Sequence, residues 1–151
     1  MDTALVILRV VVGLYLVGHG AQKLFGWFGG HGLRGTAGFL GSMLGFRPAL
    51  FWTVVAGLGE AGGGALMVLG LLGPIGPLAA AASMVVATST HVSKGVWAPK
   101  GVEMPLIYLV VALALALTGP GAYSVDALAG ISLPEPVTLY VVAALAALGT
   151  V

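Results

Sequence analysis

Residues 16–30 read LVGHGAQKLFGWFGG and join an apolar helix to a loop rich in glycine and aromatic rings. Three polar side chains, His19, Gln22 and Lys23, occupy the last two turns of this helix. They form one stripe, because residues three and four positions apart lie on the same face of a helix. A similar polar end closes a later apolar stretch at His91. The pattern indicates that polar groups from separate helices gather at one level.

The composition is that of a membrane protein. Of the 151 residues, 59% are hydrophobic and only 7% are charged, and the mean hydropathy is +1.09. A soluble domain usually carries about 25% charged residues, so these charges are too few to cover a water-soluble surface. The net charge of +1 does not indicate a nucleic-acid partner. The absence of cysteine excludes disulfides, thiol catalysis and Cys-ligated clusters.

Four apolar stretches approach the length of about 20 residues that a helix needs to cross a bilayer. They cover residues 4–22, 50–72, 75–92 and 104–118. We therefore predict an all-α integral membrane protein, with a four-helix bundle formed by residues 1–126. Residues 127–151 form a C-terminal hydrophobic extension, in which residues 137–151 are a candidate fifth helix that is short for a full crossing.

The long first loop, residues 25–49, carries many aromatic rings, which prefer the boundary between lipid and water. Thr36 is expected to cap a short amphipathic helix over residues 37–44 within it. We expect this helix to lie in the interface or to fold back into the mouth of the bundle.

The charges predict which way the chain crosses the membrane. All the loop lysines and arginines fall in the first and third loops, and the opposite side carries only acidic residues. The positive-inside rule then places the first and third loops in the cytoplasm and the N-terminus outside. The expected location is a bacterial or archaeal plasma membrane. The charges counted are Lys23, Arg34, Arg47, Lys94 and Lys100 on one side, and Asp2, Asp126 and Glu135 on the other.

Two ionisable residues are expected deep in the bilayer, where charge is costly and often functional. Glu60 lies about 15 Å from the start of its helix, and Arg9 lies about 21 Å from the Lys23 end of the first helix. Their similar depth predicts a structural ion pair. Two alternatives remain: Arg9 extends outward to the headgroups, and Glu60 acts catalytically as a proton relay.

The polar layer on the cytoplasmic side is the candidate site. His19, Gln22 and Lys23 leave the membrane where His91 does, and Glu103 begins the next helix beside Trp97. This layer, with Lys94, suits the head of a quinone held by His19, Gln22, Lys23, His91 and Trp97, with Glu103 exchanging protons. Axial ligation of haem by the two histidines is a weaker alternative. Purely structural or lipid-phosphate contacts are a third, and no metal-ligand motif is present.

Several motifs resemble the DoxX family of small membrane proteins. They are the segment from Gly18 to Gly30, Leu58-Gly59-Glu60, Thr90-His91-Val92 with Gly95-Val96-Trp97, Gly101 to Leu106, and Gly119 to Asp126. The resemblance spans roughly residues 9–126 and implies a four-helix membrane bundle. Carried over by position, it marks Arg9, His19, Gln22, Lys23, Glu60, His91 and Glu103.

The family name comes from a terminal quinol oxidase, and relatives of the DoxD type form the membrane part of a thiosulfate:quinone oxidoreductase. The resemblance therefore implies a subunit of a redox or respiratory assembly, with a partner subunit or further copies of the chain. Two other functions stay open from the residues alone. One is a non-catalytic membrane scaffold or assembly subunit, and the other is a permeation or lipid-handling protein in which Glu60 lines a solvated path.

Overall fold

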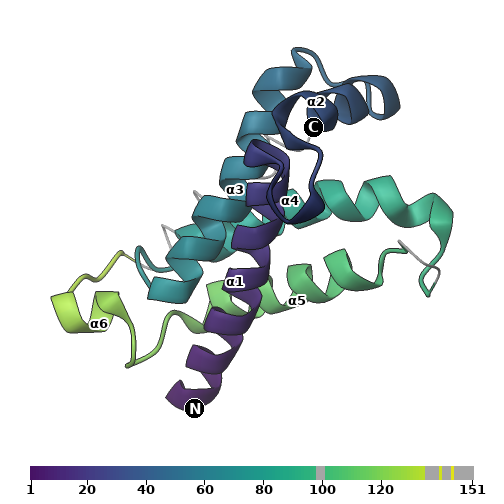
Figure 1. Ribbon diagram of the computed structural model, residues 1–151. Coiled ribbons are helices and arrows are strands. Elements are labelled where there is room, and N and C mark those ends of the chain that lie inside the picture. The colour runs from purple at the N-terminus through teal and green to yellow at the C-terminus, as the bar shows by residue number, and fades with distance from the viewer. Residues whose placement is uncertain (98–100, 135–139, 141–143, 145–151) are drawn as a thin grey trace.

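The structure is a computed structural model that describes residues 1–97, 101–134, 140 and 144. Within these residues every regular element is a helix (Figure 1). Three helices are long and apolar enough to cross a membrane, namely α1, α3, and α4 with its extension η2, whereas α5 is apolar but has only 16 residues. The elements are α1 (Asp2–Phe25), η1 (Trp27–Gly29), α2 (Gly32–Met43), α3 (Ala49–Leu69), α4 (Ile75–His91), η2 (Val92–Lys94), α5 (Glu103–Thr118) and α6 (Val125–Ala129).

The helices pack in a chain of neighbours. α1 packs mainly on α3, α3 on α4, and α4 on α5, while α2 covers α3 and the end of α1. Figure 1 shows α4 and α5 lying side by side, with α1 crossing them, and places α2 and α6 at opposite ends of the molecule. The buried core lies between these helices and is formed by Val12, Leu16, Met67, Ala80, Ala81, Met84, Tyr108, Ala112 and Leu115.

Glycines set the register between α1 and α3. A Cβ atom added to Gly64 would lie 2.6 Å from the carbonyl oxygen of Gly13, and one added to Gly13 would lie 2.7 Å from that of Gly64. Two turns further along, a Cβ atom added to Gly20 would lie 2.6 Å from the carbonyl oxygen of Gly57. The two backbones therefore touch, as small residues permit in membrane helices. Because the contacts advance in opposite directions along the two helices, α1 and α3 are antiparallel.

The pair Gly59 and Gly63, four residues apart, brings α3 against α4. A Cβ atom at Gly63 would lie 2.8 Å from the carbonyl oxygen of Gly76, and one at Gly59 would lie 2.6 Å from Oγ of Ser83. Two glycines four residues apart indicate close helix packing, and α3 and α4 do pack closely at these positions.

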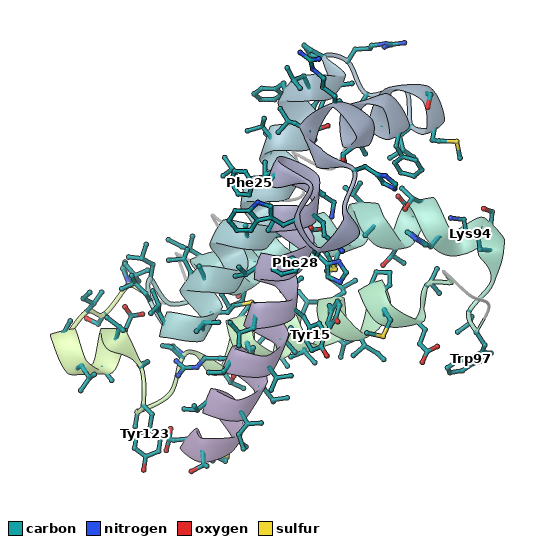
Figure 2. The ribbon with its side chains drawn as sticks, viewed as in Figure 1. Tyr15, Phe25, Phe28, Lys94, Trp97 and Tyr123 are labelled. Carbon is teal, nitrogen blue, oxygen red and sulfur yellow. The ribbon has the colours of Figure 1, made fainter. Side chains whose placement is uncertain are left out.

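A polar clamp ties α6 to the far ends of α1 and α3. The carboxylate of Asp126 accepts hydrogen bonds from the backbone N–H groups of Leu72 (3.0 Å) and Gly73 (2.7 Å). Arg9 is 3% exposed and donates from Nη2 to the carbonyl of Tyr123, which Figure 2 shows beside the start of α1. Gly70, at φ +63°, leaves the space that the Arg9 guanidinium occupies.

The structure corrects one predicted element. The short helix of the first loop begins at Gly32 after His31, not at residue 37, so Thr36 lies inside α2 and does not cap it. The less exposed positions recur at 33, 36–37 and 40, which shows that the helical period already starts at Leu33. The predicted boundary at residue 126 falls inside α6. The candidate fifth helix at residues 137–151 lies outside the described residues, except for 140 and 144.

Replacing Gly64 with alanine is expected to lower the free energy of unfolding by about 1–3 kcal/mol, because the added methyl group forces α1 and α3 apart. Gly62→Ala is the matched control, since no atom lies within 4 Å of a Cβ at that position. It should leave stability unchanged or raise it by up to about 1 kcal/mol through helix propensity. Thermal unfolding in mild detergent measures both, and equal effects would contradict the glycine register.

Candidate functional site

A cavity of about 640 Å³ opens between α1, α4 and α5, and it is called the polar cavity below. Six of the residues that the sequence marks as a site line it together: His19, Lys23, Glu60, His91, Trp97 and Glu103. Side chains far apart in the sequence thus share one chamber. Figure 2 shows Trp97 and Lys94 at the end of the α4–α5 hairpin, and of these two only Trp97 lines the cavity.

Glu60 and Lys23 form the ion pair of the site. The Glu60 side chain is only 2% exposed, whereas that of Lys23 is 29% exposed, and Nζ of Lys23 contacts Oε2 of Glu60. A buried carboxylate is stable only where a partner compensates for its lost hydration. Lys23 supplies that compensation while keeping part of its side chain open.

The partner of Glu60 is therefore Lys23, and not Arg9 as expected from depth. A helical side chain leans toward the N-terminus of its own helix. Lys23 lies near the C-terminus of α1, so its side chain points back along α1 into the membrane. Glu60 lies on the antiparallel α3, so its side chain points toward the end of the bundle at which Lys23 lies. Arg9 also points toward the N-terminus of α1, which takes it away from Glu60 and toward Tyr123, at about the level of residue 68 on α3. Depth alone does not account for the tilt of the side chains or for the glycine register between α1 and α3.

His19 is held by Gln22. Its Nδ1 lies 3.1 Å from Oε1 of Gln22, and Nε2 of Gln22 donates to the carbonyl of Phe28 at 3.2 Å. The same side chain thereby joins the histidine to the loop after α1, where Phe28 appears in Figure 2. Gln22 is not among the residues that line the cavity, and its contact with Nδ1 positions His19.

His91 is held by its own helix. Its Nδ1 lies 2.7 Å from the carbonyl oxygen of Ala87 and 2.8 Å from Oγ1 of Thr90, whose hydroxyl donates to the same carbonyl at 2.7 Å. The ring is half-buried at the end of α4. It lines the polar cavity with its remaining edge available.

Glu103 and Tyr108 complete the α5 side of the cavity. Glu103 is exposed at the first turn of α5, where a negative charge is favoured by the helix dipole, and it can exchange protons with water. Tyr108 is 6% exposed and its ring centroid lies 6.0 Å from that of His19. Sequence reasoning missed Tyr108, although its spacing from Pro105 and Met104 places all three on one helix face.

A second cavity of about 440 Å³ lies between α2, α3 and α4, and it is called the apolar cavity. Its walls include Phe39, Phe46 and Trp52, so part of the aromatic first loop lines a chamber. Other rings of that loop, such as Phe25, are exposed (Figure 2). The two cavities share four residues, Lys23, Glu60, Ala87 and His91, and the ion pair therefore stands between them.

Within the described parts of the chain, no three or more His, Cys, Asp or Glu side chains are grouped closely enough to hold a metal ion. The functional groups that line the polar cavity are two imidazoles, the carboxylate of Glu103, the paired carboxylate and ammonium of Glu60 and Lys23, a phenol and an indole. Groups of these kinds are chemically able to orient a polar ring and to exchange protons with it.

Removing Lys23 should destabilise the protein more than removing Glu60. Lys23→Met leaves a buried carboxylate without a partner, at a cost of about 2 kcal/mol or more, whereas after Glu60→Met the lysine reaches water. The double variant should be more stable than Lys23→Met alone. Melting temperatures in mild detergent test this order, with Lys94→Met as the control outside both cavities. Strictly additive effects of the two substitutions would show that the pair does not couple.

Comparison with known proteins identifies a family for this chain. Residues 4–93, which include α1, α2, α3 and α4, match the family model described as DoxX. No curated protein and no solved structure matches the chain. The match covers more than half of the sequence and includes three apolar helices long enough to span a bilayer. The chain therefore belongs to the DoxX family of membrane proteins.

Proposed function

We propose that this protein is a membrane subunit of a redox or respiratory assembly and that it binds a quinone-like molecule in the polar cavity. The observation that carries the proposal is the convergence of His19, His91 and Glu103 on one chamber beside a buried ion pair. A scaffold would need only a packed polar layer, without a chamber. Two adjoining cavities favour a bound ligand.

The chamber suits a ring with oxygen substituents. Its volume of about 640 Å³ lies within the usual range for small-molecule sites, about 300–1,000 Å³. Tyr108 and Trp97 offer aromatic faces, and the two histidines offer ring nitrogens for hydrogen bonds. Quinones supply the electron chemistry of such a site, while the protein binds the ring and moves its protons. Glu103, at the exposed edge, is the group that exchanges those protons with water.

The apolar cavity provides space for the hydrocarbon chain that membrane quinones carry. It adjoins the polar cavity through Lys23, Glu60, Ala87 and His91, and its other walls are mostly apolar. A ligand with a polar ring and an apolar chain would therefore match both chambers. Ligands of this kind reach the site directly from the bilayer.

In this proposal the protein crosses the bilayer four times. α5, with 16 residues and a length of about 24 Å, completes the crossing where the bilayer thins around it. The polar cavity then faces the cytoplasm, together with the basic first and third loops, and the N-terminus lies outside. Because the chain has no cysteine, any thiol or Cys-ligated cluster that delivers electrons belongs to a partner subunit.

The test is to purify the protein in mild detergent, extract bound lipids and quinones, and record an absorption spectrum. A quinone at a substantial fraction of one per chain is expected. His91→Ala should lower its occupancy about fivefold or more, because each lost hydrogen bond costs about 1 kcal/mol and leaves a polar ligand atom unpaired.

Glu103→Gln should leave binding largely intact and slow proton exchange, since the amide keeps the shape but not the acid–base function. Lys94→Gln is the control, because Lys94 lies near the same membrane face but lines neither cavity. Equal quinone occupancy in the wild-type protein and in the His91→Ala variant would show that the polar cavity is not the site.

A further inference from the structure

The hydrogen bonds of His19 determine which of its ring nitrogens carries the proton. The carbonyl of Phe28 can only accept, so the Gln22 amide must turn its NH₂ group toward Phe28 and its oxygen toward His19. That oxygen also only accepts. The Nδ1 atom of His19 must therefore carry the proton, and the other nitrogen, Nε2, carries a lone pair in the neutral ring.

His91 also carries its proton on Nδ1, but a different contact determines this. Its Nδ1 lies 2.7 Å from the carbonyl oxygen of Ala87, which only accepts. A lone pair on Nδ1 would face that oxygen and be repelled, so Nδ1 carries the proton here as well. The Thr90 hydroxyl is compatible with this assignment, because it can donate to the same carbonyl, 2.7 Å away, and accept from Nδ1. The Nε2 atom of His91 is again the unprotonated nitrogen.

Neither Nε2 atom has a hydrogen-bond partner among residues 1–97, 101–134, 140 and 144, and neither is enclosed. Both histidines line the polar cavity, with their Nδ1 edges turned to the protein. The cavity thus contains two acceptors held in place on two helices, α1 and α4. The ammonium of Lys23, the charged donor of the same chamber, contacts Glu60 and keeps two of its three N–H groups for other partners. Tyr108 and Trp97 contribute neutral donors, and Glu103 contributes a further acceptor.

We propose that His19 and His91 make the site selective for the reduced, hydroxyl-bearing form of an aromatic ring ligand over its oxidised, carbonyl-bearing form. A hydroquinone hydroxyl donates to Nε2, whereas a quinone carbonyl places a lone pair against it. A site built to accept a hydrogen bond rejects an analogue that lacks the donor. This inference rests on the proposed function and adds which redox form the site retains.

Three probes of matched size test the preference: a decyl-substituted benzohydroquinone, its benzoquinone, and its dimethyl ether, which keeps the shape but has no hydroxyl donor. Calorimetric titration under anaerobic conditions, at about pH 8.5 where ordinary imidazoles are neutral, measures each affinity. The hydroquinone should bind about tenfold or more tightly than either analogue, as two hydrogen bonds of ordinary strength require. His91→Phe should reduce that ratio by several-fold.

Gln22 offers a matched pair of variants. Gln22→Glu still accepts from Nδ1 of His19 and should keep the preference for the hydroquinone. Gln22→Met cannot accept, frees the tautomer of His19 and should lower the preference. A purely structural role of Gln22 at the Phe28 loop would affect both variants alike, since both lose the donor to the Phe28 carbonyl.

The tautomers of the two histidines can also be measured in the absence of a ligand. The chain has three histidines, so ¹⁵N NMR of histidine-labelled protein gives three sets of ring signals. His19 and His91 should show a protonated Nδ1, and the exposed His31 is the internal reference. Protonated Nε2 atoms at His19 and His91, or equal affinity for the hydroquinone and its ether, would overturn the inference while leaving the proposed function intact. If none of the three probes binds, the proposed function and the inference both fail.

Discussion

The buried carboxylate of Glu60 is the constraint on which this structure depends. Inside a protein surrounded by lipid, a side chain 2% exposed cannot keep its charge without a partner, and the partner must arrive from another helix. Lys23 reaches it because the glycine contacts between α1 and α3 bring the two backbones together in one register. A shift of one turn between these helices would separate the charges. The small residues of the core are thus as important to the site as its polar ones.

The position of this pair also explains why two different chambers meet. Lys23 and Glu60 line both cavities, so they form the boundary between an apolar space under α2 and a polar space beside α5. Such a boundary matches the division of an amphipathic ligand into a ring and a chain. The pair therefore joins α1 to α3 and also lines both cavities.

Much of this could be predicted from periodicity and composition. The apolar stretches predict all four of the longer helices to within a few residues, and polar groups at helix ends predict the layer of His19, His91 and Glu103. The Arg9 partner could not be predicted, because depth alone ignores the direction of the side chains and the offset between helices. The clamp of Asp126 was also missed, since it accepts from backbone N–H groups, which no residue pattern reveals. Tyr108 was overlooked as one ring in an aliphatic helix.

The polar residues of this protein differ in whether the atoms that their hydrogen bonds leave free belong to residues that line a cavity. This difference distinguishes the cluster of Asp126 and Arg9 from the two histidines. Asp126 directs both carboxylate oxygens to the backbone at the end of α3, and Arg9 is enclosed beside it, so neither lines a cavity. His19 and His91 use only one ring nitrogen each, and both residues line the polar cavity. A polar side chain within a membrane protein is costly, so each cluster is expected to contribute something that offsets this cost. The first cluster connects helices, whereas the second offers, in the proposed function, the acceptor atoms that hydrogen bonds within α1 and within α4 leave free.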